Sequence, residues 1–218
     1  MNIPFSGVLT RLSHHILHRM PFDLAQPPGG RWLVIGASLE HSLLGCGGTL
    51  SRRAEIADGA SASGGLTLAT PGANGGVGVG LGCEMIEGER VAAIADKLSR
   101  GTVDVVFAPF LGASQKDELV ALDEFSTALE KAPKWRGEIW MYETIAPLWP
   151  NRGIDISETA ERKREMLSQR VPEGELEAVL GLNRYRGLRP MLENVEAFLV
   201  LNARAFLRER RRWRRGRG

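Results

Sequence analysis

A short apolar segment, Arg31-Trp32-Leu33-Val34-Ile35-Gly36, constrains the fold of this chain more than any other feature. An apolar run without polar alternation is typical of a strand whose two faces are both covered, as in a parallel sheet between helices. The strongest strand pattern in the chain is a similar run, Val103-Asp104-Val105-Val106-Phe107-Ala108. Residues 65–70 and 137–143 are predicted as further strands.

Predicted helices separate these strands. They span residues 45–57, 87–99, 117–131, 158–169 and 173–185, and a last helix runs from about residue 192 into the C-terminal arginines. Strands that alternate with helices predict an α/β, Rossmann-like layered domain with a mostly parallel sheet flanked by helices. Ligands bind such sheets beyond the carboxyl ends of the strands. Residues 37–42 and 110–118 each follow a predicted strand, so we expect them to lie together on one rim.

The chain divides into three predicted parts. Residues 1–30 form a partly helical leader, with a helix over residues 6–20 that is followed by the turn Pro27-Pro28-Gly29-Gly30. Residues 31–205 form the α/β domain, and a chain of 218 residues is long enough for one such domain. Within it, residues 72–82 are a glycine-rich loop. Residues 206–218 form a basic, arginine-rich tail.

The composition is that of a globular protein, with 43% hydrophobic and 25% charged residues. No apolar run is long enough to cross a bilayer. Arginines and histidines interrupt the first 20 residues, so we do not expect a secretory signal. The two cysteines, Cys46 and Cys83, form no disulfide framework. They favour a reducing, cytoplasmic setting.

The net charge of +2 hides an asymmetry along the chain. Residues 204–218 contain eight arginines and one glutamate, so the rest of the chain is net negative. Arginines interleaved with Trp213 suit RNA, an anionic membrane surface or an acidic partner. The alternative is a disordered, solubilising end. A nucleic-acid partner and a peripheral position at the membrane are therefore both open at this point.

The most specific motif in the chain is Leu33-Val34-Ile35-Gly36-Ala37 followed by Leu44-Gly45-Cys46-Gly47-Gly48-Thr49-Leu50. It resembles a motif of the PIG-L/LmbE family of zinc-dependent N-acetylglucosaminyl deacetylases. Other similar motifs follow in the family's order over residues 31–200: Asp104 to Pro109, Tyr142-Glu143, Asn151, Asp155-Ile156-Ser157, Lys163, Ser168-Gln169, Leu182 to Leu188 and Glu196-Ala197-Phe198. The resemblance implies the family's layered α/β fold.

The resemblance also implies a zinc site, for which the family uses a His-x-x-Asp pair and a distant His. Ser38 takes the position of the first His, His41 that of the Asp, and Glu118 that of the distant His. The zinc motifs of this chain are therefore degenerate.

The family's catalytic groups are a carboxylate that acts as general base and a His, assisted by an Asp, that stabilises the oxyanion or protonates the leaving amine. Glu40 takes the general-base position. Gln115 takes the position of the His, and Asp117 that of its assisting Asp. A Gln side chain can donate a hydrogen bond to an oxyanion but cannot deliver a proton.

Two interpretations of these positions are open. In one, His41 and Glu118 are ligands of a remodelled metal site, Ser38 or water completes the shell, and Glu40 is the base. In the other, which we favour, the pocket is a relic lined by ordinary polar groups, because catalytic zinc usually has three protein ligands.

We therefore predict a deacetylase-family protein that has lost catalysis, a pseudoenzyme with a ligand-binding, partner or regulatory role. Its ligand would be a sugar conjugate or a protein partner, and no cofactor is expected unless the remodelled site holds zinc. The first alternative is a divergent metal-dependent deacetylase that hydrolyses the N-acetyl group of an N-acetylglucosamine conjugate. The second is a basic-tailed interaction protein. Homo-oligomer formation is compatible with each of them.

Overall fold

The computed structural model describes residues 22–59, 65–70, 83–86 and 89–215. The predicted leader helix over residues 6–20 and the glycine-rich loop over residues 72–82 lie outside these ranges. The described strands are β1 (Asp23–Ala25), β2 (Trp32–Ile35), β3 (Leu66–Ala69), β4 (Cys83–Met85), β5 (Val105–Pro109), β6 (Glu138–Tyr142), β7 (Arg152–Asp155) and β8 (Val195–Asn202). The described helices are α2 (Leu39–Gly59), α3 (Arg90–Ser99), α4 (Lys116–Lys131), α5 (Ala160–Ser168), α6 (Glu173–Gly187) and α7 (Ala203–Arg215).

One sheet of eight strands forms the centre of the molecule, in the order β1-β7-β8-β6-β5-β2-β3-β4. All neighbouring strands are parallel except β8, which is antiparallel to both β6 and β7. The predicted α/β fold with a mostly parallel sheet flanked by helices is therefore confirmed.

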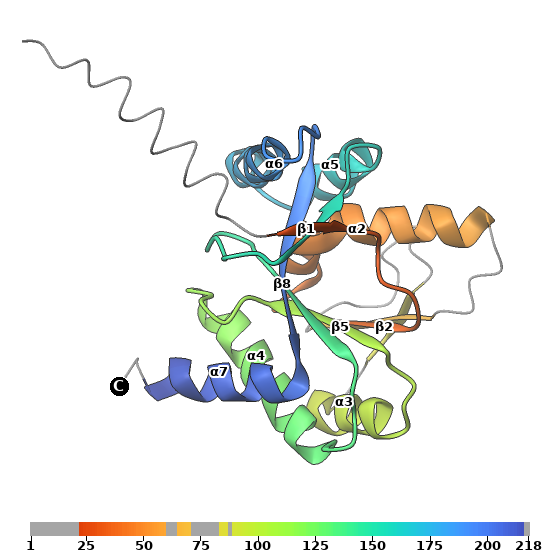
Figure 1. Ribbon diagram of the computed structural model, residues 1–218, viewed down its shortest axis with the longest axis vertical. Coiled ribbons are helices and arrows are strands. Elements are labelled where there is room, and N and C mark those ends of the chain that lie inside the picture. The colour runs from red at the N-terminus through yellow and green to blue at the C-terminus, as the bar shows by residue number, and fades with distance from the viewer. Residues whose placement is uncertain (1–21, 60–64, 71–82, 87–88, 216–218) are drawn as a thin grey trace, which may run out of the picture.

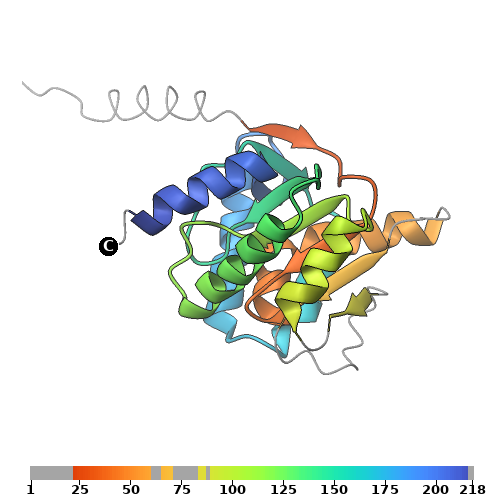
Figure 2. The ribbon, with the colours of Figure 1, turned by 90° about the horizontal axis from the view of Figure 1, so that it is seen from below.

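Helices cover both faces of the sheet. Helices α2, α5 and α6 lie on one face, and α3, α4 and α7 lie side by side on the other (Figures 1 and 2). Successive residues of β2 alternate between the two layers: Trp32 and Val34 pack in the first core, and Leu33 and Ile35 in the second. All four are buried, which explains why β2 has no polar alternation in the sequence.

The prediction of a helix from about residue 192 is wrong for its first part. Residues 195–202 form β8, which lies between β6 and β7, and the helix begins only at Ala203. Leu, Ala and Glu are good helix formers, but the tertiary structure places this segment in the middle of the sheet. Helix α7 then continues across position 206, where the basic tail was expected to begin.

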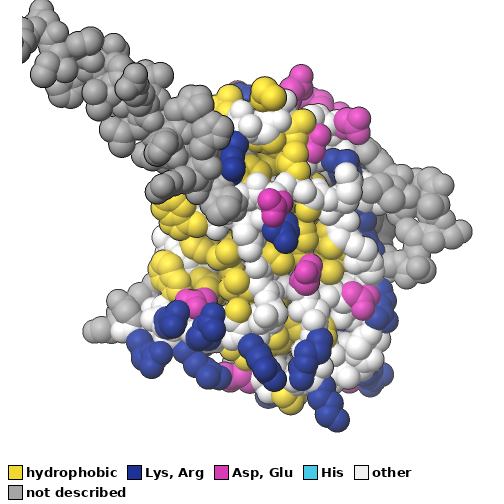
Figure 3. Space-filling view, viewed as in Figure 1, with side chains coloured by type: hydrophobic (Ala, Val, Ile, Leu, Met, Phe, Trp, Pro, Cys, Tyr) yellow, Lys and Arg dark blue, Asp and Glu magenta, His cyan; other side chains and the backbone are white. Residues whose placement is uncertain are grey.

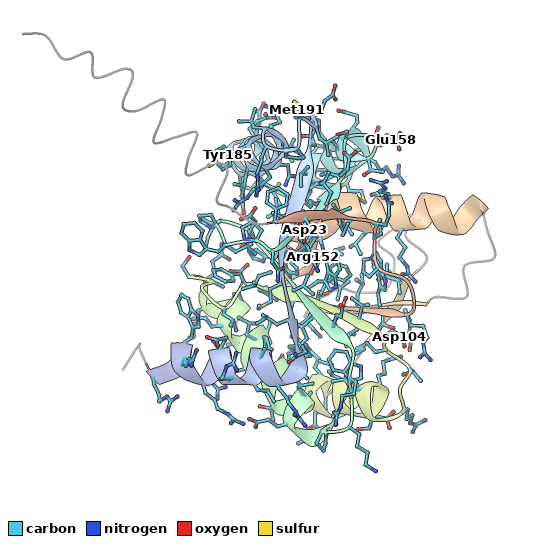
Figure 4. The ribbon with its side chains drawn as sticks, viewed as in Figure 1. Asp23, Asp104, Arg152, Glu158, Tyr185 and Met191 are labelled. Carbon is cyan, nitrogen blue, oxygen red and sulfur yellow. The ribbon has the colours of Figure 1, made fainter. Side chains whose placement is uncertain are left out.

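Three short strands, β1, β4 and β7, have no counterpart in the sequence prediction. Strand β1 lies within the segment predicted as leader and pairs in parallel with β7, and the Asp23 carboxylate lies 3.2 Å from Arg152 Nη1 (Figure 4). Strand β4 forms the opposite edge of the sheet. These segments are only three or four residues long, so their own sequence patterns are weak. Among the described residues, no helix is long and apolar enough to span a membrane.

Candidate functional site

The site predicted from the sequence lies where β2 ends and α2 begins. Helix α2 starts at Leu39, six residues before the predicted start, because Ser38 caps it: Ser38 Oγ accepts a hydrogen bond from the His41 amide at 3.3 Å. The same hydroxyl lies 3.2 Å from His41 Nδ1. The Ser42 hydroxyl donates to the Ser38 carbonyl at 3.1 Å. Ser38 and His41 are thus held together by the first turn of the helix.

Glu118 lies in the first turn of α4 and is buried, with 1% of its surface exposed. The Thr144 hydroxyl donates to Glu118 Oε1 at 2.7 Å. Burial raises the pKa of Glu118 above its usual value, and the Thr144 hydrogen bond and the charge of His41 partly oppose this effect. Strands β2 and β5, which precede the two segments, are parallel neighbours, so both segments lie at the same edge of the sheet. The structure therefore brings residues 37–42 and 110–118 to one rim, as their positions after two strands predict.

Tyr142, at the end of β6, lies directly beneath these residues. Its hydroxyl donates to the Ile35 carbonyl at 2.8 Å, and burial raises its pKa well above the usual value. Its ring lies against Gly45, where an added Cβ would be 2.0 Å from Tyr142 Cδ2. Tyr142 and Thr144 have no predicted role in the site. The signal in the sequence is that both lie at or just beyond the end of a predicted strand, whose carboxyl end meets the same rim.

The other three predicted site residues are more peripheral. The Glu40 carboxylate lies 3.9 Å from Arg170 Nη1, just beyond the end of α5. Gln115 is the residue that precedes α4, and Asp117 is exposed in the first turn of that helix. Of the six predicted residues, only Glu118 is buried; Ser38, Glu40, His41 and Gln115 are partly exposed.

Solved structures with similar folds include the following two. A conserved protein from Thermus thermophilus is 22% identical, and the match covers 77% of this chain and 93% of that chain with a TM-score of 0.60. The N,N'-diacetylchitobiose deacetylase from Pyrococcus horikoshii is 17% identical, and the match covers 93% of this chain and 95% of the enzyme with a TM-score of 0.58. This chain has the PIG-L/LmbE-like deacetylase fold. No protein-family model and no curated protein matches it.

The zinc that the deacetylase fold implies does not fit the donor set at the rim. Among the described residues, no group of three or more His, Cys, Asp or Glu side chains is placed to hold a metal ion. His41 and Glu118 are ordinary zinc ligands, whereas Ser38 supplies a neutral hydroxyl that already bonds with His41. A catalytic zinc site needs three protein ligands and an open position. The residues present supply two.

A buried ion pair stabilises the helix below the site. Helix α2 is broken at Cys46, where φ is −140° and ψ is 17°. Glu196 accepts hydrogen bonds from the Gly48 and Thr49 amides at 2.9 and 2.8 Å, at the start of the second helical segment. Lys163 Nζ donates to Glu196 at 2.8 Å and to the Leu44 carbonyl at 2.6 Å, at the end of the first segment. The pair therefore satisfies backbone groups on both sides of the break.

A second buried ion pair ties down the loop that carries Thr144. Arg186 Nε and Nη2 donate to the two Glu143 oxygens at 2.9 and 2.7 Å, and Nη2 also donates to the Leu148 carbonyl. The Leu148 amide donates back to Glu143. This closed set of bonds fixes the loop after β6 while Ile145 and Trp149 remain exposed.

Proposed function

We propose that this chain is a deacetylase-fold protein that has lost hydrolytic activity and binds an N-acetylated sugar conjugate at the rim. The observation that carries the proposal is the bonding of the three positions at which the family has zinc ligands. The Ser38 hydroxyl bonds with His41, and Glu118 Oε1 accepts the Thr144 hydroxyl. The Ser38 hydroxyl and one Glu118 oxygen are thus engaged within the protein, and two conventional donors are fewer than the three protein ligands that catalytic zinc usually has.

The surroundings of these groups support ligand binding rather than a purely structural role. The polar groups His41, Glu118 and Thr144 meet at one rim, next to a loop that exposes 76% of Trp149. Sites for small ligands combine a few fixed polar groups with apolar and aromatic surface. The Pyrococcus enzyme is named for N,N'-diacetylchitobiose, which makes an N-acetylated sugar the first ligand class to test.

The test combines metal analysis, an acetate-release assay and calorimetric titration with N,N'-diacetylchitobiose and longer N-acetylated oligosaccharides. We expect far less than one zinc per chain, no acetate release and measurable binding. Glu118→Gln should weaken binding at least tenfold, because the buried carboxylate is replaced. Glu130→Gln changes an exposed acid near the other end of the same helix and serves as the matched control.

One observation favours the alternative, a metal-dependent hydrolase. His41 and Glu118 stand on the segments that follow the parallel neighbours β2 and β5, and both are side chains that can bind zinc. Stoichiometric zinc that is lost in His41→Ala, together with acetate release, would establish this alternative and overturn the first proposal. Binding of neither zinc nor sugar would leave both without support.

The two cysteines are relevant to the cellular compartment of the protein. Cys46 is buried and Cys83 half-buried, and both are free thiols. Free thiols suit the reducing interior of the cell, and we propose a cytoplasmic location.

A further inference from the structure

Helix α7 carries a stripe of arginines on its outer face. Arg204, Arg208, Arg211 and Arg215 follow one another at spacings of four, three and four residues, which places them on one side of a helix. All four are exposed. At 1.5 Å per residue the stripe is about 16 Å long. In Figure 3, Lys and Arg side chains gather over the lower part of the molecule, where Figure 1 shows α7.

The inner face of α7 holds the helix against the body. Phe206 is fully buried, and its ring centroid lies 5.2 Å from that of Phe125 on α4. Arg210 is buried and pairs with Asp123. Trp213 packs edge-on against Phe110, with ring centroids 6.1 Å apart. The helix therefore presents its arginines in a fixed orientation, which distinguishes it from a disordered basic end.

The stripe keeps a surplus of positive charge after its ion pairs are counted. Arg208 pairs with Glu209 at 3.2 Å and Arg211 with Glu130 at 3.4 Å, and both pairs are exposed. Arg204 and Arg215 have no ion pair with any other described residue. Exposed ion pairs contribute little and exchange readily for another anion. Arginine is also the side chain best suited to phosphate, which it binds through two parallel N–H groups.

A groove at the start of α7 adds apolar surface to this charge. It has a volume of about 300 Å³ and lies between the end of α4 and the start of α7. Leu129, Trp135 and Leu207 supply its apolar lining. Arg136, Arg204 and Arg211 supply its positive charge and Glu130 a negative one, so the groove is net positive and continuous with the stripe. Apolar surface beside several guanidinium groups suits a base attached to its phosphates.

We propose that the outer face of α7 binds single-stranded RNA, with the phosphate backbone along the arginine stripe and one base in the groove. A membrane surface fits this helix less well. A helix that lies in a bilayer interface inserts its apolar face, whereas the apolar face of α7 is packed against the protein. The proposal concerns a surface formed by α4 and α7 and does not depend on the function of the rim.

The test measures binding of a fluorescently labelled 20-nucleotide RNA by anisotropy over a range of salt concentrations. The variant Arg204→Gln/Arg208→Gln/Arg215→Gln removes stripe charges without touching Arg210, Trp213 or the Arg211–Glu130 pair. The control Arg162→Gln/Arg184→Gln/Arg189→Gln removes the same charge from exposed arginines at the α5–α6 end of the molecule. Thermal unfolding of both variants verifies that they are folded.

We expect the stripe variant to bind at least tenfold more weakly at about 0.1 M salt and its salt slope to fall by about 2, since each phosphate contact on a single strand contributes about 0.7. The control should bind like the natural chain. Equally weakened RNA binding in both variants would contradict the assignment of the binding site to the arginine stripe. Inorganic polyphosphate that competes as well as the RNA at equal charge would overturn the assignment to nucleic acid. A clear preference for anionic lipid vesicles over RNA would replace RNA with a membrane surface.

Discussion

The fold changes the pKa of Glu118 within the site. It is buried, and burial raises its pKa despite the Thr144 hydrogen bond and the nearby imidazole of His41. A carboxyl whose pKa is raised on folding stabilises the native state at low pH, and this contribution is lost as the pH rises through the native pKa. The buried Glu118 carboxyl therefore lowers stability at neutral pH, and such perturbed groups are common at functional sites.

Replacing this carboxyl with an amide should raise stability in a pH-dependent way. In Glu118→Gln the amide oxygen can still accept the Thr144 hydroxyl, and no charge has to be buried. We expect a higher melting temperature than that of the natural chain at pH 7 and no difference at pH values below the usual pKa of a glutamic acid, about 4.3. Thermal denaturation across this range is the measurement. A Glu118→Gln chain that is less stable at pH 7 would mean that the carboxylate–imidazole attraction outweighs burial.

Helix α2 shows how one element depends on distant side chains. Its break at Cys46 leaves carbonyls and amides that cannot bond within the helix, and Lys163 and Glu196 satisfy them from α5 and β8. Both side chains are fully buried. Such a pair is costly to break, because a single substitution leaves a buried charge without a partner.

One single and one double variant separate charge pairing from capping of the break. Lys163→Met should lower the free energy of unfolding by about 3–5 kcal/mol. Lys163→Met/Glu196→Gln should be more stable than this single variant, because no charge remains buried. Its free energy of unfolding should stay below that of the natural chain, since one amide oxygen cannot replace two carboxylate oxygens at Gly48 and Thr49. Urea denaturation gives the three values, and full recovery in the double variant would show that capping contributes nothing.

Asp123 on α4 pairs with two arginines of α7, Arg210 and Arg214. Burial would raise the pKa of Asp123, but hydrogen bonds from Arg214 and Arg210 outweigh this effect and lower it. A carboxyl whose pKa is lowered on folding stabilises the native state above its unfolded pKa, and this contribution is lost as the pH falls through the native pKa.

Asp123→Asn should therefore destabilise the protein at pH 7 by about 1 kcal/mol, because Arg210 loses its charged acceptor and solvent screens the half-exposed Asp123. The difference from the natural chain should shrink as the pH falls below about 3.9, the usual pKa of an aspartic acid. Chemical denaturation at several pH values measures this. Asp117→Asn, in the exposed first turn of the same helix, is the control and should change stability little.

At the scale of the whole molecule, α7 belongs to the layered domain although its sequence has the composition of a tail. It forms part of the core with α3 and α4, and its end lies against Phe110 and Gly112, just beyond β5. The basic helix is also matched to acids of α4, Asp123 and Glu130, in a body that is net negative.

Truncation tests whether the domain includes this helix. A chain that ends at Asn202 loses Phe206 and exposes the apolar side of α4, and loss of a buried Phe alone costs about 3–5 kcal/mol. We expect a markedly lower melting temperature and binding of a hydrophobic dye. A chain that ends at Arg215 keeps α7 and should behave like the full chain. Equal stability of the two truncated chains would make α7 an appendage.

Local sequence patterns are enough to predict the α/β architecture and the edge of the sheet that carries the site. The continuous apolar runs at β2 and β5 can be buried only in a sheet covered on both faces, and the segments that follow two parallel strands must meet at one edge. That is why the segments 37–42 and 110–118 could be expected on one rim, whereas the choice of Ser38, His41 and Glu118 within them came from the family resemblance. These inferences rest on local patterns, which the chain carries wherever it folds.

Other features depend on tertiary packing and could not be predicted from local patterns. Residues 195–202 are as compatible with a helix as with a strand, and their place between β6 and β7 made them β8. The pairing of Lys163 with Glu196, the position of Thr144 over Glu118 and the docking of α7 join residues far apart in the chain. No local pattern encodes such contacts, because each side chain finds its partner only after the layers have packed. The same packing turned an arginine-rich segment into a helix with one buried face and one cationic face.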